Sequence, residues 1–250
     1  MRPARPFVLC YHAISSSWPS PLAVTIPDLR TRLERLKAYG YVGLTFAEAE
    51  RRRRAGTLPA KTVVVTFDDA YRSVNEARPV LESLDFPATV YAVGAYLDEA
   101  RLLEWPGIED WLETPHRHEL RCLGRQELLE LRDGGWEIGS HTMTHARLPQ
   151  LDDESCRDEL VRSRELITEI FGRCETVAYP YGAADARVAR LAAEAGYLAG
   201  CTLSYAHRVD EPFRRPRFDA SAAGGRLRQW AKLSAPGRAL RRSPLATLRR

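Results

Sequence analysis

Short apolar runs rich in β-branched residues alternate with helix-like segments along most of this chain. Seven runs have the composition of buried strands: 7–14, 41–46, 62–69, 88–94, 136–142, 176–182 and 198–204. Apolar residues at helical spacing predict helices over 27–39, 71–84, 124–134, 152–171 and 184–195. Such alternation is typical of parallel strands joined by crossover helices. It therefore predicts an α/β fold, either a doubly wound sheet or a barrel.

The chain of 250 residues is long enough for one domain with a full core. No internal repeat or low-complexity linker precedes residue 222, so residues 1–222 are predicted to form a single domain. Residues 223–250 contain eight Arg or Lys and no acid, which leaves 29 basic and 33 acidic side chains in the rest. The prediction is thus a slightly acidic body followed by a strongly basic tail.

The basic tail has three interpretations. Its leucines and Trp230 alternate with cations, which suits an amphipathic helix lying on anionic lipid. A disordered, solvated tail or a contact with the acidic body fits the same composition. Nucleic acid is not an expected partner, because the body offers no base-reading motif.

The remaining composition predicts a cytoplasmic protein, in peripheral contact with the inner membrane face if the tail binds lipid. The start MRPARPFVLCYHAI is no secretory signal, and no stretch approaches ~18 apolar residues. The five cysteines are odd in number and widely spaced, which favours a reducing compartment: Cys10, Cys122, Cys156, Cys174 and Cys201.

An adjacent pair of carboxylates ends the third apolar run. The β-branched residues 63–65 lead directly to Asp68 and Asp69, at the carboxyl end of a predicted strand. Functional groups collect at such ends in parallel α/β folds. Because like charges this close raise one another's pKa, the pair needs a nearby cation, or is simply a polar strand end.

The stretch WEIGSHTMTH places two histidines four residues apart after the fifth run. If the strand turns into a helical loop after Gly139, His141 and His145 project from one face and can chelate one ion. Each signal alone is weak, since surface histidines and capping aspartates are common. Together they predict a His₂-Asp metal site, with the second aspartate as a free base beside it.

Three stretches in order resemble the first three motifs of the polysaccharide deacetylase family, which contains the nodulation-type deacetylases and is also called carbohydrate esterase family 4. They are TFDD at 66–69, HTMTH at 141–145 and YPYG at 179–182. The similarity runs from about Phe7 to Phe218, nearly the whole predicted domain. It implies a distorted (β/α) barrel of seven strands and removal of acetyl groups from a glycan.

The resemblance also implies roles for individual residues. Asp68 corresponds to the catalytic base, and Asp69, His141 and His145 to the ligands of one divalent ion. Zn²⁺ is the leading candidate, while Co²⁺, Ni²⁺ or Fe²⁺ suit the same ligands. The backbone N–H of Tyr181 would face the oxyanion, and the implied substrate-binding residues are Tyr179, Pro180 and Tyr181.

The chain departs from the family pattern at three points. Many members begin the third motif with an Arg that tethers the base, where this chain has Ala178. Arg217 is the candidate replacement, the alternative being a surface charge. The family's fourth-motif Asp and late His are not found, and the context of His207 does not match. His12 is therefore a candidate general acid or substrate contact, or a structural strand-end histidine.

The segment 96–125 is longer than a simple strand-to-helix connection. It carries four rings: Trp105, Trp111, His116 and His118. Aromatic rings in an insertion at the rim suit stacking on sugars, but such residues more often pack the insertion onto the barrel. Packing is the preferred interpretation.

These observations predict a metal-dependent hydrolase that removes acetyl groups from a carbohydrate such as a bacterial cell-envelope or exopolysaccharide sugar. N-acetyl groups are the preferred expectation over O-acetyl groups. One alternative is hydrolysis of a small non-peptide C–N bond, in an amide or a cyclic imide, on the same fold. Another is a non-catalytic glycan-binding domain. The intact Asp68 argues against the last, because a binder needs no free carboxylate beside its metal ligand.

Overall fold

The computed structural model describes residues 5–97, 101–203 and 210–220. Seven strands of the described residues form a closed parallel barrel, in which β1 pairs with both β5 and β10. The strands are β1 (Phe7–Tyr11), β5 (Thr62–Asp68), β6 (Ala88–Ala92), β7 (Glu137–Ser140), β8 (Thr176–Ala178), β9 (Ala199–Leu203) and β10 (Arg215–Asp219). The predicted seven-stranded (β/α) barrel is confirmed.

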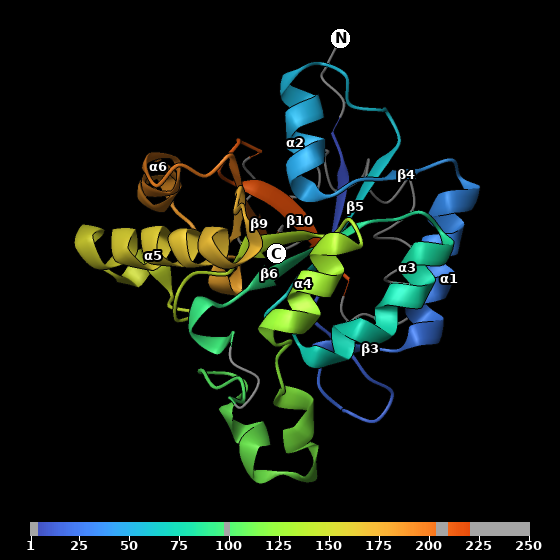
Figure 1. The fold of residues 1–250 in the computed structure, drawn as a ribbon, viewed down its shortest axis with the longest axis horizontal. Helices are drawn as coiled ribbons and strands as arrows, with labels where there is room; N and C mark the ends of the chain where they lie inside the picture. Colours follow the sequence, from blue (N-terminus) through green and yellow to red (C-terminus); the bar gives the residue numbers. More distant parts are fainter. Residues whose placement is uncertain (1–4, 98–100, 204–209, 221–250) are drawn as a thin grey trace, which may run out of the picture.

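Helices surround this barrel (Figure 1). They are α1 (Ile26–Ala38), α3 (Arg78–Ser83), α4 (Arg125–Asp133), α5 (Asp153–Phe171) and α6 (Ala186–Glu194). The longest, α5, begins where the sequence predicts, because Asp152 accepts a hydrogen bond from the Ser155 N–H. It ends at Gly172, whose φ of 84° is the left-handed conformation that glycine adopts readily. None of the described helices is both long and apolar enough to cross a bilayer.

Four predicted elements differ from the structure. In the run 176–182 the strand β8 ends at Ala178, before a 3₁₀ turn at Pro180–Gly182. The run 41–46 gives only a two-residue edge strand, β4 (Val42–Gly43), and then α2 (Phe46–Arg54), which was not predicted. The run 7–14 divides into β1 and a short β2 (Ala13–Ile14), which pairs with β3 (Ala23–Val24). The predicted helix 71–84 starts as a 3₁₀ helix, η1 (Arg72–Ala77), ahead of α3.

The helix α2 closes the amino-terminal end of the barrel. The Phe46 N–H donates to the Thr89 hydroxyl, and the Ala47 N–H donates to the Glu137 carboxylate at 2.8 Å. Glu137 also accepts hydrogen bonds from Thr89 and Thr176, and burial raises its pKa. A buried carboxylate thus meets the positive end of the helix, which leaves the opposite rim for chemistry.

The inside of the barrel changes from apolar to polar toward its carboxyl-terminal rim. Val64 lies inside among apolar side chains, whereas Thr66 and Asp68, two and four residues further along β5, meet Arg217. This follows from the two-residue period of a strand. Tyr91 fills the space beside Gly139, where a Cβ would lie 2.6 Å from its ring.

The segment 101–122 projects at the end of the barrel opposite α2 (Figure 1). It contains two short 3₁₀ helices, η3 (Glu109–Glu113) and η4 (Pro115–Leu120). Its two ends are joined where the Leu103 N–H donates to the Leu120 carbonyl at 2.9 Å. Further 3₁₀ turns are η2 (Gly94–Tyr96), η5 (Leu148–Gln150) and η6 (Pro180–Gly182).

Candidate functional site

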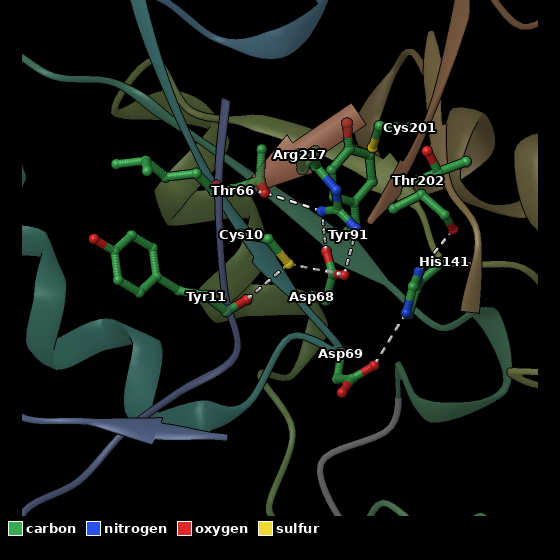
Figure 2. A network of polar contacts seen from close by, with 12 residues as sticks. Cys10, Tyr11, Thr66, Asp68, Asp69, Tyr91, His141, Cys201, Thr202 and Arg217 are labelled. Atoms are coloured by element: carbon green, nitrogen blue, oxygen red, sulfur yellow. Dashed lines mark hydrogen bonds and ion pairs between the residues drawn. The ribbon is translucent and has the colours of Figure 1, made fainter. Parts of the chain in front are cut away.

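The two adjacent aspartates point in different directions. Asp68 is the last residue of β5 and lies inside the barrel, whereas the backbone turns at Asp69 with a φ of 69°. Aspartate tolerates this left-handed conformation better than most residues. As a result the Asp68 carboxylate faces Arg217, and the Asp69 carboxylate faces His141 (Figure 2).

Asp68 forms a buried, bidentate ion pair with Arg217. Both guanidinium-to-carboxylate distances are 2.6 Å, and the two side chains are 4% and 0% exposed. Arg217 also donates to the Thr66 hydroxyl at 3.0 Å. Burial raises the pKa of Asp68, but Arg217, together with His141 and His12, outweighs it and lowers that pKa to about 2. Asp68 is therefore held ionised and in one orientation, by the arginine that the sequence indicated.

Cys10 adds a contact that the sequence did not reveal. Its Sγ lies 3.4 Å from Asp68 Oδ2 (Figure 2). Burial raises the pKa of Cys10 well above its ordinary value, so the thiol is protonated and can donate. The carboxylate consequently accepts from a neutral donor as well as from the guanidinium.

Asp69, His141 and His145 bring one donor atom each to a common point. Nε2 of His141 and of His145 lie 3.2 and 3.4 Å from Asp69 Oδ1. All three side chains are buried, and Asp69 Oδ1 has no hydrogen-bond partner among the described residues. Burial raises the pKa of Asp69, but the two imidazoles outweigh it and hold that pKa well below its usual range.

The orientation of His141 fits this group to a cation. Its Nδ1 lies 2.7 Å from the Ala178 carbonyl and donates there, which leaves the lone pair of Nε2 facing Asp69 Oδ1. Two acceptors then face each other, an arrangement that a bound metal ion satisfies. Burial lowers the pKa of His141, but Asp68 and Asp69 outweigh it and raise that pKa, so the site favours positive charge. These residues therefore form a site fit for one divalent metal ion.

The loop that carries the histidines is not helical, contrary to the prediction from their spacing. Thr142 and His145 have φ values of 66° and 64°, so the chain turns sharply twice between the two rings. Glu159 of α5 holds this loop by accepting from the backbone N–H groups of Met143 and Thr144, each at 2.9 Å. A carboxylate from a distant helix, rather than helical periodicity, therefore brings the imidazoles together.

Tyr181 lies beside His145 in the turn η6. Its φ of 59° and ψ of 11° are left-handed, its hydroxyl donates to the Pro106 carbonyl, and its ring lies 4.8 Å from the His145 ring. The other two predicted substrate-binding residues differ. Pro180 is buried, and Tyr179 is fully buried with its hydroxyl donating to the Phe213 carbonyl. The Tyr179 side chain thus belongs to the core, and the substrate-binding role of Tyr179 and Pro180 stays a prediction.

His12 lies at the same rim. One donor atom each from His12, Cys10 and Asp68 lie within 4.8 Å of one another. The Nδ1 atom of His12 is buried and has no hydrogen-bond partner among the described residues. The backbone hydrogen bond expected of a purely structural histidine is therefore not seen for Nδ1, and one ring nitrogen lies close to the Asp68 carboxylate.

The two tryptophans of the insertion pack against other rings at the rim, as the sequence favoured, whereas His118 is exposed. Trp111 makes an edge-to-face contact with Trp18, at 5.6 Å between ring centroids. Trp105 stacks on His145, at 4.0 Å. The insertion thus contacts a candidate metal ligand directly, which the sequence gave no means of seeing. His207 and the basic tail, residues 223–250, lie outside the described residues.

The chain is similar in sequence to known proteins. The sequence model described as polysaccharide deacetylase matches residues 55–200. YxkH of Bacillus subtilis (strain 168), named provisionally as a polysaccharide deacetylase, is 28% identical over 204 residues, which cover 80% of this chain and 65% of YxkH. The poly-β-1,6-N-acetyl-D-glucosamine N-deacetylase of Staphylococcus aureus (strain N315) is 24% identical over 171 residues, which cover 64% of this chain and 54% of that protein. The chain thus spans about half to two thirds of these curated relatives.

Solved structures show the same fold. BC0361, a polysaccharide deacetylase from Bacillus cereus, is 25% identical with a TM-score of 0.69, covering 91% of this chain and 68% of that one. The deacetylase PplD of Streptococcus pyogenes, solved in complex with acetate, has a TM-score of 0.73 at 22% identity. The match covers 88% of this chain and 94% of PplD. At that identity the second similarity concerns the fold alone.

Proposed function

The chain belongs to the polysaccharide deacetylase family, and from this premise we propose that it is a metal-dependent hydrolase of acetyl groups on a carbohydrate. One observation carries the proposal. The Asp69, His141 and His145 group lies beside a carboxylate, Asp68, that is ionised and yet paired with Arg217 rather than with the candidate ligands. Such a hydrolysis needs one carboxylate to bind the metal ion and a second one to accept a proton as general base.

We assign the metal ligands as Asp69, His141 and His145, and the ion as Zn²⁺. Two neutral imidazoles and one carboxylate, with coordination positions left for water and substrate, are typical of catalytic zinc, although Co²⁺, Ni²⁺ or Fe²⁺ suit the same donors. Burial lowers the pKa of His145, which supports a neutral ligand ring. Such an ion supplies Lewis acidity, which polarises the acetyl carbonyl and makes water more acidic.

In the proposed mechanism Asp68 accepts a proton from the attacking water while the water oxygen bonds to the acetyl carbon. Arg217 fixes the carboxylate geometry and keeps it unprotonated beforehand. The backbone N–H of Tyr181 stabilises the developing oxyanion. The C–N bond then breaks, and the leaving amine takes up a proton, for which His12 is our candidate donor. Acetate and a free amine are the products.

The substrate we propose is an N-acetylated glycan of a bacterial envelope or exopolysaccharide. The named activity of the Staphylococcus aureus relative, on poly-β-1,6-N-acetyl-D-glucosamine, makes oligomers of that polymer the first to assay. For the same reason we propose N-acetyl groups rather than O-acetyl groups as the preferred substrate. A small amide or cyclic imide is the competing substrate class.

The test measures acetate released by Zn²⁺-loaded protein from three substrates. These are β-1,6-linked N-acetylglucosamine oligomers, β-1,4-linked ones, and O-acetylated xylan. We expect release from an N-acetylated oligomer, abolished by chelation and by Asp68→Asn. Asp133→Asn is the matched control, because Asp133 is exposed on α4, away from the rim. Zinc-loaded protein that releases acetate from none of them, but hydrolyses a cyclic imide, would overturn the proposal.

A further inference from the structure

The two histidines of the site are held by different means. His141 donates from Nδ1 to the Ala178 carbonyl, a hydrogen bond that fixes both its tautomer and its ring plane. The Nδ1 atom of His145 is buried and has no hydrogen-bond partner among the described residues. The torsion that rotates an imidazole ring has broad minima, so packing must set the plane of His145.

Trp105 provides that packing. Its indole lies almost parallel to the His145 ring, at 4.0 Å between centroids and 18° between planes. The ring of Tyr181 contacts His145 edge-to-face at 4.8 Å, so a second aromatic side chain also borders the imidazole. Offset or parallel stacking at this separation restricts a ring more than a general apolar contact does.

Trp105 is itself fixed. It is 7% exposed and makes a perpendicular contact with Tyr96, at 5.3 Å between ring centroids. The Tyr96 hydroxyl donates at 2.7 Å to the carbonyl of Glu104, the residue before the indole. The next residue, Pro106, accepts from the Tyr181 hydroxyl. Both neighbours of Trp105 are thus bonded to residues outside the insertion.

We propose that Trp105 is the positioning residue for His145 and does by stacking what the Ala178 carbonyl does for His141 by hydrogen bonding. The inference rests on the proposed function, in which His145 is a metal ligand. It makes the insertion 101–122 part of the metal centre rather than only a cover for the barrel. Loss of the flat ring should therefore weaken metal binding, because a ligand that must be ordered on binding contributes less affinity.

The experiment compares Zn²⁺ affinity, by competition with a chromophoric chelator, in wild type and four variants. Trp105→Ala and Trp105→Leu remove the flat ring, and Trp105→Leu keeps most of the apolar volume in case the alanine variant does not fold. Trp105→Phe restores a flat ring. Trp111→Phe is the matched control, because Trp111 belongs to the same insertion but packs against Trp18 and His116 rather than a ligand.

We expect the alanine and leucine variants to bind Zn²⁺ about tenfold more weakly, the scale seen when a partner of a metal-bound histidine is removed. The Trp105→Phe and Trp111→Phe variants should stay near the wild-type value. With Co²⁺ the visible absorption spectrum should change in Trp105→Leu and not in Trp111→Phe. Equal affinity and identical Co²⁺ spectra in folded Trp105→Leu and wild type would overturn the inference.

Acetate release by the wild type separates this inference from the proposed function. Wild type that binds Zn²⁺ but releases no acetate refutes the function, while a weaker Trp105→Leu still supports the inference. Wild type that releases acetate while Trp105→Leu binds Zn²⁺ equally well refutes the inference alone. Wild type that binds neither Zn²⁺ nor Co²⁺ refutes both.

Discussion

Replacing Arg217 by Met tests how the barrel interior keeps Asp68 charged. The substitution removes two hydrogen bonds of 2.6 Å and leaves a carboxylate that is 4% exposed without its cation. Removing one partner of a buried ion pair typically costs about 3–5 kcal/mol in the free energy of unfolding. The double variant Asp68→Asn with Arg217→Met should recover most of this, because an amide leaves no buried charge.

The pH dependence of the effect has a defined sign. In the wild type the pKa of Asp68 is lowered from 3.8 to about 2, so Asp68 stabilises the fold above pH ~4 by about 2 kcal/mol. That contribution is lost as the pH falls to about 2. Without Arg217, burial is opposed only by His141 and His12, so the pKa rises and more of the carboxyl is neutral in the folded protein at low pH. Arg217→Met should therefore lose less stability at pH 4.5 than at pH 7, and least near pH 2.

Urea unfolding of metal-free protein in the presence of a chelator, at pH 4.5 and 7, measures both effects. Arg217→Lys is the matched control, since it keeps the charge but loses the bidentate geometry, and it should fall between wild type and Arg217→Met. A loss below about 1 kcal/mol at pH 7, or no recovery in the double variant, would refute the reasoning.

Three further predictions concern the same rim. Glu159→Gln should weaken Zn²⁺ binding about tenfold, measured by chelator competition, because the carboxylate that orders the histidine loop is lost. Glu165→Gln, at an exposed position of α5, should leave Zn²⁺ affinity unchanged. His12→Gln should lower kcat for an N-acetylated oligomer by about 10²–10⁴-fold with little change in KM; an unchanged kcat in steady-state assays would exclude it as the acid. Zn²⁺ should raise the Tm of the wild type and not that of Asp69→Asn, by thermal denaturation.

The fold and the site were predictable where the sequence is locally consistent. The β-branched residues of β5 favour a strand, and the capping residues of α5 mark both ends of that helix, so local sequence alone predicts both elements. The strand β10 was missed because RPRFD contains two arginines and a proline, and only the barrel interior explains them: Arg215 pairs with Glu50, and Arg217 with Asp68. The helix α2 was not predicted because its last four residues are arginines, so the segment lacks a clear apolar periodicity.

The contacts that orient the ligands could not be predicted from one sequence. Trp105 and His145 are 40 residues apart, and Glu159 meets the ligand loop from another helix. The two left-handed residues of that loop replaced the helix that the histidine spacing indicated. Such contacts depend on tertiary packing, to which residue spacing gives no access.

The central claim is that Asp68 does the proton transfer beside a metal that other residues hold. The most direct measurement is acetate release from an N-acetylglucosamine oligomer by wild type and Asp68→Asn, each with its bound zinc determined on the same sample. The account predicts one Zn²⁺ per chain in both proteins and acetate from the wild type alone. Acetate release by zinc-loaded Asp68→Asn at the wild-type rate would contradict it.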